Sequence, residues 1–294
     1  MIKAVGIAKD HIDYRTIRCG GGRLIDFGRP KIMGILNVTP DSFYIKSRVE
    51  GEELRRRCLS MIADGASILD VGGYSSRPGC VDVSADEEWH RLRDGLTIIR
   101  EAVGKDVIIS VDTFRSEIAR KSVSEFGVGI INDISGGTAD PDMFGTVAEL
   151  GVGYVLMHMR GNARTMMEFT DYSDVTSEVI GDLAFKLAGL RQLGVADVIV
   201  DPGFGFSKTT EGNFELMRNL PEFGRLGCPV LVGISRKGMI WKSLGVTPEE
   251  SLNGTTALNM AALMGGADIL RVHDVKAAAE TVELYMRIKT PSKL

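Results

Sequence analysis

The chain has 294 residues, of which 44% are hydrophobic and 25% are charged, and its formal net charge is -4. This composition is typical of a globular protein, and the length allows one large α/β barrel or two medium domains. The slightly acidic balance argues against nucleic acid as a partner, and the absence of any apolar stretch near the roughly 20 residues that span a bilayer argues against a membrane.

The first 30 residues predict a hairpin. Cys19-Gly20-Gly21-Gly22 is a turn-forming sequence between two short alternating stretches, 16–18 and 23–27. We expect this hairpin to cover the bottom of a barrel that the rest of the chain forms.

From Lys31 onward the chain repeats one plan, in which a short apolar run ends in polar residues and a helical pattern follows. The first run ends near Val38, because Pro40 cannot donate to a ladder of backbone hydrogen bonds. Strands are predicted over 31–38, 67–73, 106–113, 129–135, 153–159, 197–204, 229–235 and 269–274. Helices are predicted over 51–64, 84–103, 116–126, 141–150, 175–193, 212–220, 237–244, 251–264 and 275–287.

Eight such units, each near the roughly 30 residues of a βαβ unit, predict an α/β fold, the (β/α)8 TIM barrel. A doubly wound open sheet is the alternative. No linker rich in Pro, Gly or Ser divides the chain, so we predict a single domain over residues 1–294. TIM barrels place their chemistry at the carboxyl ends of the strands, so the polar residues that end the apolar runs are the candidate site residues.

Three of these strand-end residues, Asp112, Asn132 and Asp201, suit a flat heterocycle. A ring with an N–C–N edge presents donors to a carboxylate, and an amide can both donate and accept. The plainer interpretation of each residue alone is a helix N-cap or a turn former. Their convergence in one barrel mouth favours the binding site.

A second group of candidates is cationic or hydroxylic. Ser75-Ser76-Arg77 follows the second predicted strand and Ser235-Arg236-Lys237 the seventh, while Arg271 and His273 point the same way on the eighth. Barrels commonly hold phosphate near strands 7 and 8. The alternative is that Arg77 and Lys237 pair with surface carboxylates.

Two apparent motifs do not fit a known site. The stretch 203–209 lacks the spacing of a phosphate-binding loop. His158, between Met157 and Met159, has no second histidine at ligand spacing, so we predict a buried, hydrogen-bonded histidine and no zinc site.

Eight motifs in order resemble the dihydropteroate synthase family along nearly the whole chain. They are MGILNVTPDSF (33–43), GGYSSRPG (72–79), SVDT (110–113), INDISGG (131–137), MHMRG (157–161), DPGFGFSKT (201–209), GISRK (233–237) and RVHDV (271–275). The resemblance implies a TIM barrel that usually forms homodimers. It also implies an enzyme, a transferase that joins 6-hydroxymethyl-7,8-dihydropterin diphosphate to 4-aminobenzoate and releases diphosphate and 7,8-dihydropteroate.

The resemblance also implies roles for single residues. The pterin would be bound by Asp112, Asn132, Asp201 and Lys237, with Met157 and Phe206 as further substrate contacts. The diphosphate would be held by Asn37, Arg271 and His273, with Mg²⁺ near Asn37. The aminobenzoate and leaving group would be bordered by Ser76, Arg77, Pro78 and Ser235. Catalytic roles would fall to Asp112, Lys237 and Arg77.

The chain departs from the family pattern at a few positions. Tyr74 stands where Glu is common, Ser76 where Thr is common, and Asn162-Ala163 where Thr-Pro is frequent. Two alternatives remain open, a pterin-dependent methyltransferase and a catalytically silent pterin-binding homologue. A methyl donor has no diphosphate, so the Ser235-Arg236-Lys237 and Arg271-Val272-His273 motifs argue against the methyltransferase. Only Tyr74 favours the silent homologue.

The cysteines predict the compartment. Cys19, Cys58, Cys80 and Cys228 are widely spaced and contain no CxxC pair, which is typical of reduced thiols in a cytoplasmic protein.

Overall fold

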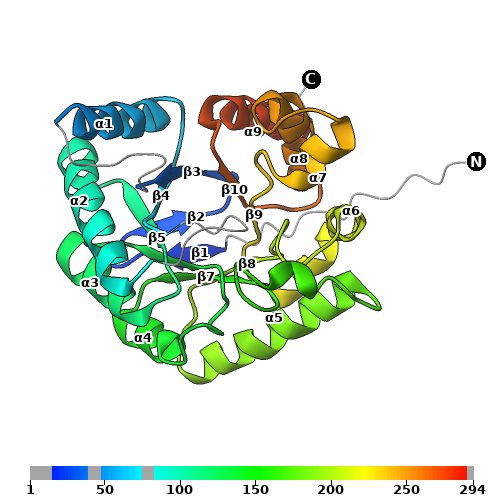
Figure 1. The fold of residues 1–294 in the computed structure, drawn as a ribbon, viewed down its shortest axis with the longest axis horizontal. Coiled ribbons are helices and arrows are strands. Elements are labelled where there is room, and N and C mark those ends of the chain that lie inside the picture. The colour runs from blue at the N-terminus through cyan, green and yellow to red at the C-terminus, as the bar shows by residue number, and fades with distance from the viewer. Residues whose placement is uncertain (1–14, 39–47, 75–82, 290–294) are drawn as a thin grey trace, which may run out of the picture.

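The computed structural model describes residues 15–38, 48–74 and 83–289. Within them, eight parallel strands form a nearly closed barrel surrounded by helices, which confirms the predicted TIM-barrel class (Figure 1). The barrel strands are β3 (Lys31–Asn37), β4 (Ile68–Gly72), β5 (Ile108–Asp112), β6 (Ile130–Asp133), β7 (Gly153–Met157), β8 (Val198–Asp201), β9 (Leu231–Val232) and β10 (Ile269–Val272). Their order is β8-β7-β6-β5-β4-β3-β10-β9, and a parallel bridge between Val200 and Val230 joins the two ends of the sheet.

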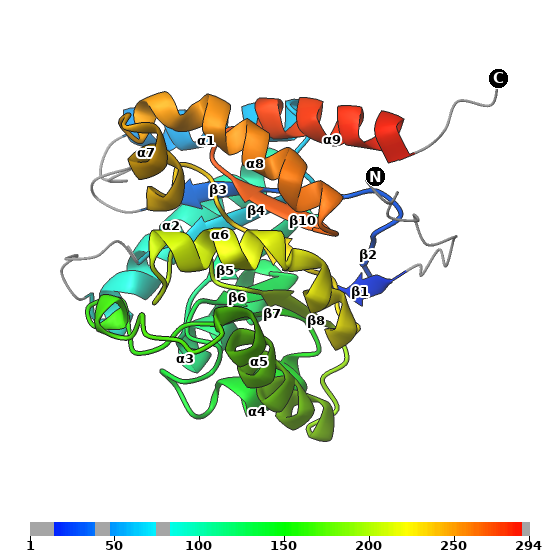
Figure 2. The ribbon, with the colours of Figure 1, turned by 90° about the vertical axis from the view of Figure 1, so that its right-hand side faces the viewer.

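The outer layer consists of helices that alternate with the strands along the chain (Figures 1 and 2). They are α1 (Arg48–Ala63), α2 (Ala85–Val103), α3 (Ser116–Phe126), α4 (Met143–Leu150), α5 (Val175–Gln192), α6 (Thr210–Arg218), α7 (Gly238–Leu244), α8 (Leu252–Met264) and α9 (Val275–Lys289). Short 3₁₀ segments span η1 (Met166–Glu168), η2 (Leu220–Leu226) and η3 (Glu249–Ser251). In this part of the chain, no helix is both long and apolar enough to cross a lipid bilayer.

The predicted bounds hold within a few residues, and β9 is the strand that shortens most. The strand predicted over 229–235 shrinks to Leu231–Val232. Pro229 has no N–H to donate, and beyond the strand the chain turns, with Lys237 N donating to Ile234 O at 3.0 Å and Arg236 at a φ of 56°. Ser84 is the N-cap of α2, because its Oγ accepts from Glu87 N at 3.2 Å. The single-domain organisation stays a prediction.

The N-terminal hairpin closes the amino end of the barrel, as predicted. Strands β1 (Thr16–Arg18) and β2 (Leu24–Asp26) pair antiparallel, and the glycines between them adopt φ values of 56 to 78° that other residues rarely adopt. The buried hairpin side chains pack against residues near the starts of the barrel strands; the cluster is Ile17, Cys19, Ile25, Phe27, Met33, Ile68, Ile130, Val155, Ile199, Leu231 and Ile269. The larger core cluster lies between the sheet and the helices. The opposite end of the barrel is therefore the end that the hairpin leaves uncovered.

Candidate functional site

Most of the predicted site residues lie at one end of the barrel, at or just beyond the carboxyl ends of the strands. Asn37 ends β3, Asp112 ends β5, Met157 ends β7 and Asp201 ends β8. The other members at this end are Asn132 in β6, Phe206 after β8, Ser235 and Lys237 after β9, Arg271 in β10 and His273 directly after it. Ser76, Arg77 and Pro78 lie outside the described residues.

A cluster of charged and polar side chains around Arg271 spans the barrel interior. Arg271 Nε donates to Asp70 Oδ2 at 2.7 Å, and Nη2 donates to Asp112 Oδ2 at 2.6 Å. Asn132 Nδ2 also donates to Asp70 Oδ2, at 3.0 Å. Asp70 is fully buried, and its Oδ1 has no hydrogen-bond partner. The cluster links four strands of the barrel, so the mouth residues are held relative to one another.

Asp70 is a site residue that the sequence analysis missed. It lies in the middle of β4, ILDVG, where all neighbouring residues are buried. A carboxylate inside an apolar strand needs a buried partner, and this signal alone could have marked it.

In this cluster, burial and the neighbouring charges shift the pKa values of Asp112 and Arg271 in opposite directions. Burial raises the pKa of the Asp112 carboxyl to about 7, although the Arg271 guanidinium acts to lower it. Burial acts to lower the pKa of Arg271, but the charges of Asp70 and Asp112 outweigh it and raise that pKa above its ordinary value. Arg271 therefore remains a permanent cation at the mouth.

Asp201 is fixed by the loop that follows β8, residues 202–209. Gly203 N donates to Asp201 Oδ1 at 2.7 Å, and the carboxylate is buried. Burial raises its pKa, and the nearby Lys237 opposes that shift. One carboxylate oxygen, Oδ1, is thus engaged by the backbone.

Lys237 lies against the same loop. Its Nζ donates to Phe204 O and lies 4.5 Å from the centre of the Phe206 ring. Burial lowers the pKa of Lys237 to about 8, and the charge of Asp201 acts in the opposite direction. Asp201, Phe206 and Lys237 therefore form one compact group, as the sequence analysis expected of pterin-binding residues.

Ser235 and His273 form a hydrogen-bonded pair across β9 and β10. Ser235 Oγ lies 3.0 Å from His273 Nδ1 and accepts from His273 N at 3.2 Å. The hydroxyl proton is then available to Nδ1, which favours the tautomer with a proton on Nε2. Burial lowers the pKa of His273 to about 4, and Arg271 acts in the same direction, so the imidazole is neutral at pH 7.

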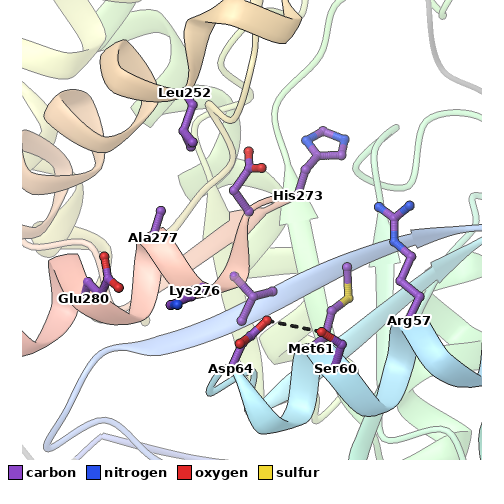
Figure 3. A pocket seen from close by; sticks show the side chains of 11 residues that line it. Arg57, Ser60, Met61, Asp64, Leu252, His273, Lys276, Ala277 and Glu280 are labelled. Atoms are coloured by element: carbon purple, nitrogen blue, oxygen red, sulfur yellow. Dashed lines mark hydrogen bonds between the residues drawn. The ribbon is translucent and has the colours of Figure 1, made fainter.

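A cavity of about 530 Å³ lies beside this pair, between α1 and the start of α9 (Figure 3). His273 is the one predicted site residue that lines it, and Arg57 points toward the same space (Figure 3). The remaining lining residues are Ser60, Met61, Asp64, Leu252, Asp274, Val275, Lys276, Ala277 and Glu280. The cavity therefore adjoins the proposed diphosphate end of the site and not Asp201.

An apolar wall completes the mouth. Ile134, Met157, Met159 and Met166 form one buried cluster, against which Phe114 and Phe206 pack. Apolar side chains such as these suit the faces of a ring. The predicted contacts Met157 and Phe206 thus belong to the same wall.

Asn37 is the predicted metal ligand. Gly72 lies between Asn37 and Asp112: a Cβ added at Gly72 would lie 3.4 Å from Asn37 Oδ1 and 3.5 Å from Asp112 Cβ. The Asn37 side chain therefore points along the mouth toward β5. No group of three or more His, Cys, Asp or Glu side chains in the described ranges could hold a metal on its own. Mg²⁺ often uses one or two protein ligands together with substrate phosphates and water, so a lone Asn37 fits that ion only beside a bound phosphate.

His158 and Tyr74 can now be placed. His158 is buried with Lys208 Nζ 3.0 Å from its Nδ1, which confirms the predicted hydrogen-bonded histidine.

Tyr74 packs edge-on against Phe114 with 5.2 Å between ring centres, and Arg115 lies 5.8 Å from the Tyr74 ring. Arg115 also forms an ion pair with the buried Glu88. Glu88 therefore places a carboxylate beside Arg115, although position 74 carries Tyr in place of the common Glu.

The chain matches the family model described as "Pterin binding enzyme" over residues 33–273. It is 42% identical over 270 residues to a dihydropteroate synthase of Synechocystis sp., an alignment that covers 88% of this chain and 91% of the relative. Among solved structures, the Xanthomonas albilineans dihydropteroate synthase with 4-aminobenzoic acid aligns with a TM-score of 0.85 and 35% identity, over 94% of this chain and 100% of that one. The same enzyme in complex with 7,8-dihydropteroate aligns with a TM-score of 0.83 and 33% identity over the same shares.

Proposed function

The chain belongs to the dihydropteroate synthase family of pterin-binding enzymes, and on this premise we propose how its barrel mouth performs that reaction. The mouth binds 6-hydroxymethyl-7,8-dihydropterin diphosphate and 4-aminobenzoate, and it releases 7,8-dihydropteroate and diphosphate. One observation carries the proposal: two carboxylates, Asp112 and Asp201, share the mouth with two cations, Arg271 and Lys237; Asp201 is buried and the other three are partly buried. The carboxylates suit the donor edge of a pterin, and the cations suit a polyanionic leaving group.

The pterin ring occupies the space between Asp201 and the Arg271 cluster. The Asp201 carboxylate accepts two donors from the N–C–N edge of the ring, and Asp112 and Asn132 contact the opposite edge. Met157 and Phe206 cover the ring faces, in keeping with their place in the apolar wall. Lys237 lies beside the ring, where its charge balances that of Asp201.

The diphosphate lies toward β3 and β10. Arg271 uses Nε and Nη2 for its two carboxylates, so Nη1 is the atom we expect to donate to a phosphate oxygen. His273 is neutral and donates from Nε2. We propose that Mg²⁺ joins the diphosphate with Asn37 as its protein ligand, where the ion would neutralise charge on the leaving group.

The reaction is a substitution at the pterin methylene carbon. The C–O bond breaks with its electron pair left on the diphosphate, and the amine nitrogen of 4-aminobenzoate forms the new C–N bond and then loses a proton to water. Positive charge develops on the methylene, and the nearby Asp112 carboxylate offsets it. Arg271 stabilises the developing negative charge. An aryl amine is neutral and nucleophilic at pH 7, so the site needs no strong base.

The second substrate is proposed to contact Ser235 and the Ser76-Arg77-Pro78 segment. Ser235 lies within hydrogen-bond distance of His273, so it lies at the leaving-group end of the site. Arg77 would act on the leaving group or the aminobenzoate carboxylate, since a guanidinium pairs with either anion.

We also propose a cytoplasmic homodimer. Buried free thiols at Cys19, Cys58 and Cys228 support a reducing compartment. Exposed apolar side chains on neighbouring helices support self-association; they are Leu244 on α7, Leu252 and Met264 on α8, and Leu284 and Ile288 on α9.

The proposed reaction is tested directly with purified protein, pterin diphosphate, Mg²⁺ and radiolabelled 4-aminobenzoate. We expect labelled pteroate, and none when the pterin substrate lacks its diphosphate, because the C–O bond then has no competent leaving group. A complete protein that forms no labelled product while still binding the pterin would instead be a silent homologue.

A further inference from the structure

Lys208 is a buried lysine that the proposed reaction does not use. Burial lowers its pKa to about 7, and the charge of Asp201 acts in the opposite direction. Lys208 is 2% exposed, and its Nζ donates to Gly203 O at 3.0 Å and Phe206 O at 2.9 Å. The third neighbour is His158 Nδ1 at 3.0 Å. An ammonium has three donors and no acceptor, so these three acceptors can satisfy it, with His158 O farther away at 3.5 Å.

His158 is the acceptor in this contact. Burial lowers the pKa of His158 to about 2, and the charge of Lys208 acts in the same direction, so Nδ1 carries no proton when Lys208 is charged. Lys208 thereby ties the chain after β7 to the loop after β8 (202–209). Ser207 Oγ adds a second link between the same two segments, since it accepts from Arg160 N at 2.9 Å.

The loop tied by Lys208 carries three groups of the pterin site. Gly203 N holds Asp201 Oδ1, Phe206 contributes its ring, and Phe204 O accepts from Lys237 Nζ. The ammonium of Lys208 contacts the carbonyls of Gly203 and Phe206. A change at Lys208 therefore reaches Asp201, Phe206 and Lys237 together.

The loop has a backbone shape that needs such a restraint. Gly203 has a φ of 72°, and a Cβ there would lie 2.0 Å from His158 O. Gly205 has a φ of 80° and Ser207 a φ of 46°, and the latter is unfavourable for a residue with a side chain. Further interactions must hold this conformation. Lys208 supplies two within the loop, to the carbonyls of Gly203 and Phe206, and one to His158 outside it.

We propose that Lys208, with His158 as its third acceptor, is a positioning residue that shapes the pterin-ring half of the site without contacting substrate. This inference rests on the proposed function. It separates the ring end of the site, which depends on the 202–209 loop, from the diphosphate end at Arg271 and His273, which lies on other elements.

The test is Lys208→Met, which keeps much of the side-chain volume and removes all three donors. Calorimetric titration should show 6-hydroxymethylpterin binding on the order of tenfold weaker, because hydrogen bonds from charged groups are the strong ones. Binding of inorganic diphosphate with Mg²⁺ should stay within about twofold. The KM for pterin diphosphate should rise while kcat changes by less than about threefold, because ring contacts persist unchanged in the transition state.

Lys121→Met is the matched control, since Lys121 pairs with Glu117 on the surface of α3. It should change none of these values. If Lys208→Met does not fold, two variants of His158 test the proposal. His158→Asn keeps an acceptor near the Nδ1 position and should retain pterin affinity, whereas His158→Leu has no acceptor and should lose it.

Equal loss of ring and diphosphate binding, or unchanged ring binding in folded Lys208→Met, would overturn the inference. Equal affinities in folded His158→Asn and His158→Leu would overturn it as well. Failure of the unmodified protein to form pteroate would count against the proposed function instead, since the ring and diphosphate titrations do not depend on turnover.

Discussion

Asp201 is engaged by the protein through one carboxylate oxygen, because Gly203 N donates to Oδ1 at 2.7 Å. In Asp201→Asn the amide oxygen can keep that contact, which turns the amide NH₂ toward the pterin and sets donor against donor. We expect pterin affinity to fall by about a hundredfold or more, since losing a charge-assisted bond alone costs about 1.5–3 kcal/mol. The thermal midpoint should change little. Calorimetric titration beside a melt measures both, and unchanged affinity would remove Asp201 from the site.

Lys237 predicts a pH dependence. Burial lowers the pKa of its ammonium to about 8, so Lys237 is charged below that pH and becomes neutral as the pH rises through it. Pterin affinity should therefore decline above about pH 8, where the charge that balances Asp201 is lost. In Lys237→Arg this alkaline decline should move beyond pH 10, because a guanidinium stays charged. Titrations from pH 6 to 10 check it; identical alkaline limbs in the two proteins would assign the decline to another group.

Asn37 and the diphosphate together predict a specific metal requirement. Excess chelator should abolish turnover, because the cations at this end, Arg271 among them, do not neutralise a leaving group with three or more negative charges. Binding of 6-hydroxymethylpterin, which has no diphosphate, should be unaffected by the chelator. Full turnover in excess chelator would contradict the proposed role of Mg²⁺.

Among the structural elements, the β1–β2 hairpin is the one whose stability effect is easiest to isolate. Ile25 is 4% exposed and packs into the bottom of the barrel, while its neighbour Leu24 is 61% exposed. Ile25→Ala should lower the free energy of unfolding by about 2–4 kcal/mol, and Leu24→Ala by less than about 0.5 kcal/mol. Urea denaturation compares the two variants.

The kinetic constants of both hairpin variants should match those of the unmodified protein where the protein is folded, because the hairpin and the site lie at opposite ends of the barrel. A change in the KM for pterin diphosphate in Ile25→Ala would mean that the two ends are coupled. Equal destabilisation by the two substitutions would show that the packing of Ile25 against the amino end of the barrel does not stabilise the protein.

For the whole molecule, the exposed apolar surface on α7–α9 predicts the oligomer. Leu284 on α9 is 61% exposed, and Leu284→Asp should convert the proposed dimer to a monomer, because a carboxylate buried without a partner in an interface is costly. Phe185 on α5 is 81% exposed and supplies the control, since Phe185→Asp should leave the dimer intact. Light scattering measures the molar mass of each protein. An unmodified protein that is monomeric at all concentrations would contradict the proposed dimer.

The barrel and the places of most candidate residues along it could be predicted from local patterns in the chain. Apolar runs that end in Asn37, Asp112, Asp201 and His273 mark the strand ends, because a buried parallel strand is apolar along its length and the chain becomes polar where the strand ends. The turn at 19–22 could also be predicted locally, because it depends on the conformational preferences of neighbouring residues.

Which of these residues lie together could not be predicted in this way, because it depends on contacts between distant parts of the chain. Asp70 lies 201 positions from Arg271 in the chain, yet their side chains are 2.7 Å apart. Lys208 meets His158 across 50 positions, and the bridge from Val200 to Val230 brings the two ends of the sheet together. Pairings of this kind follow from barrel closure and from the need of each buried charge for a partner. Local sequence patterns record neither, because both depend on residues that are distant in the chain.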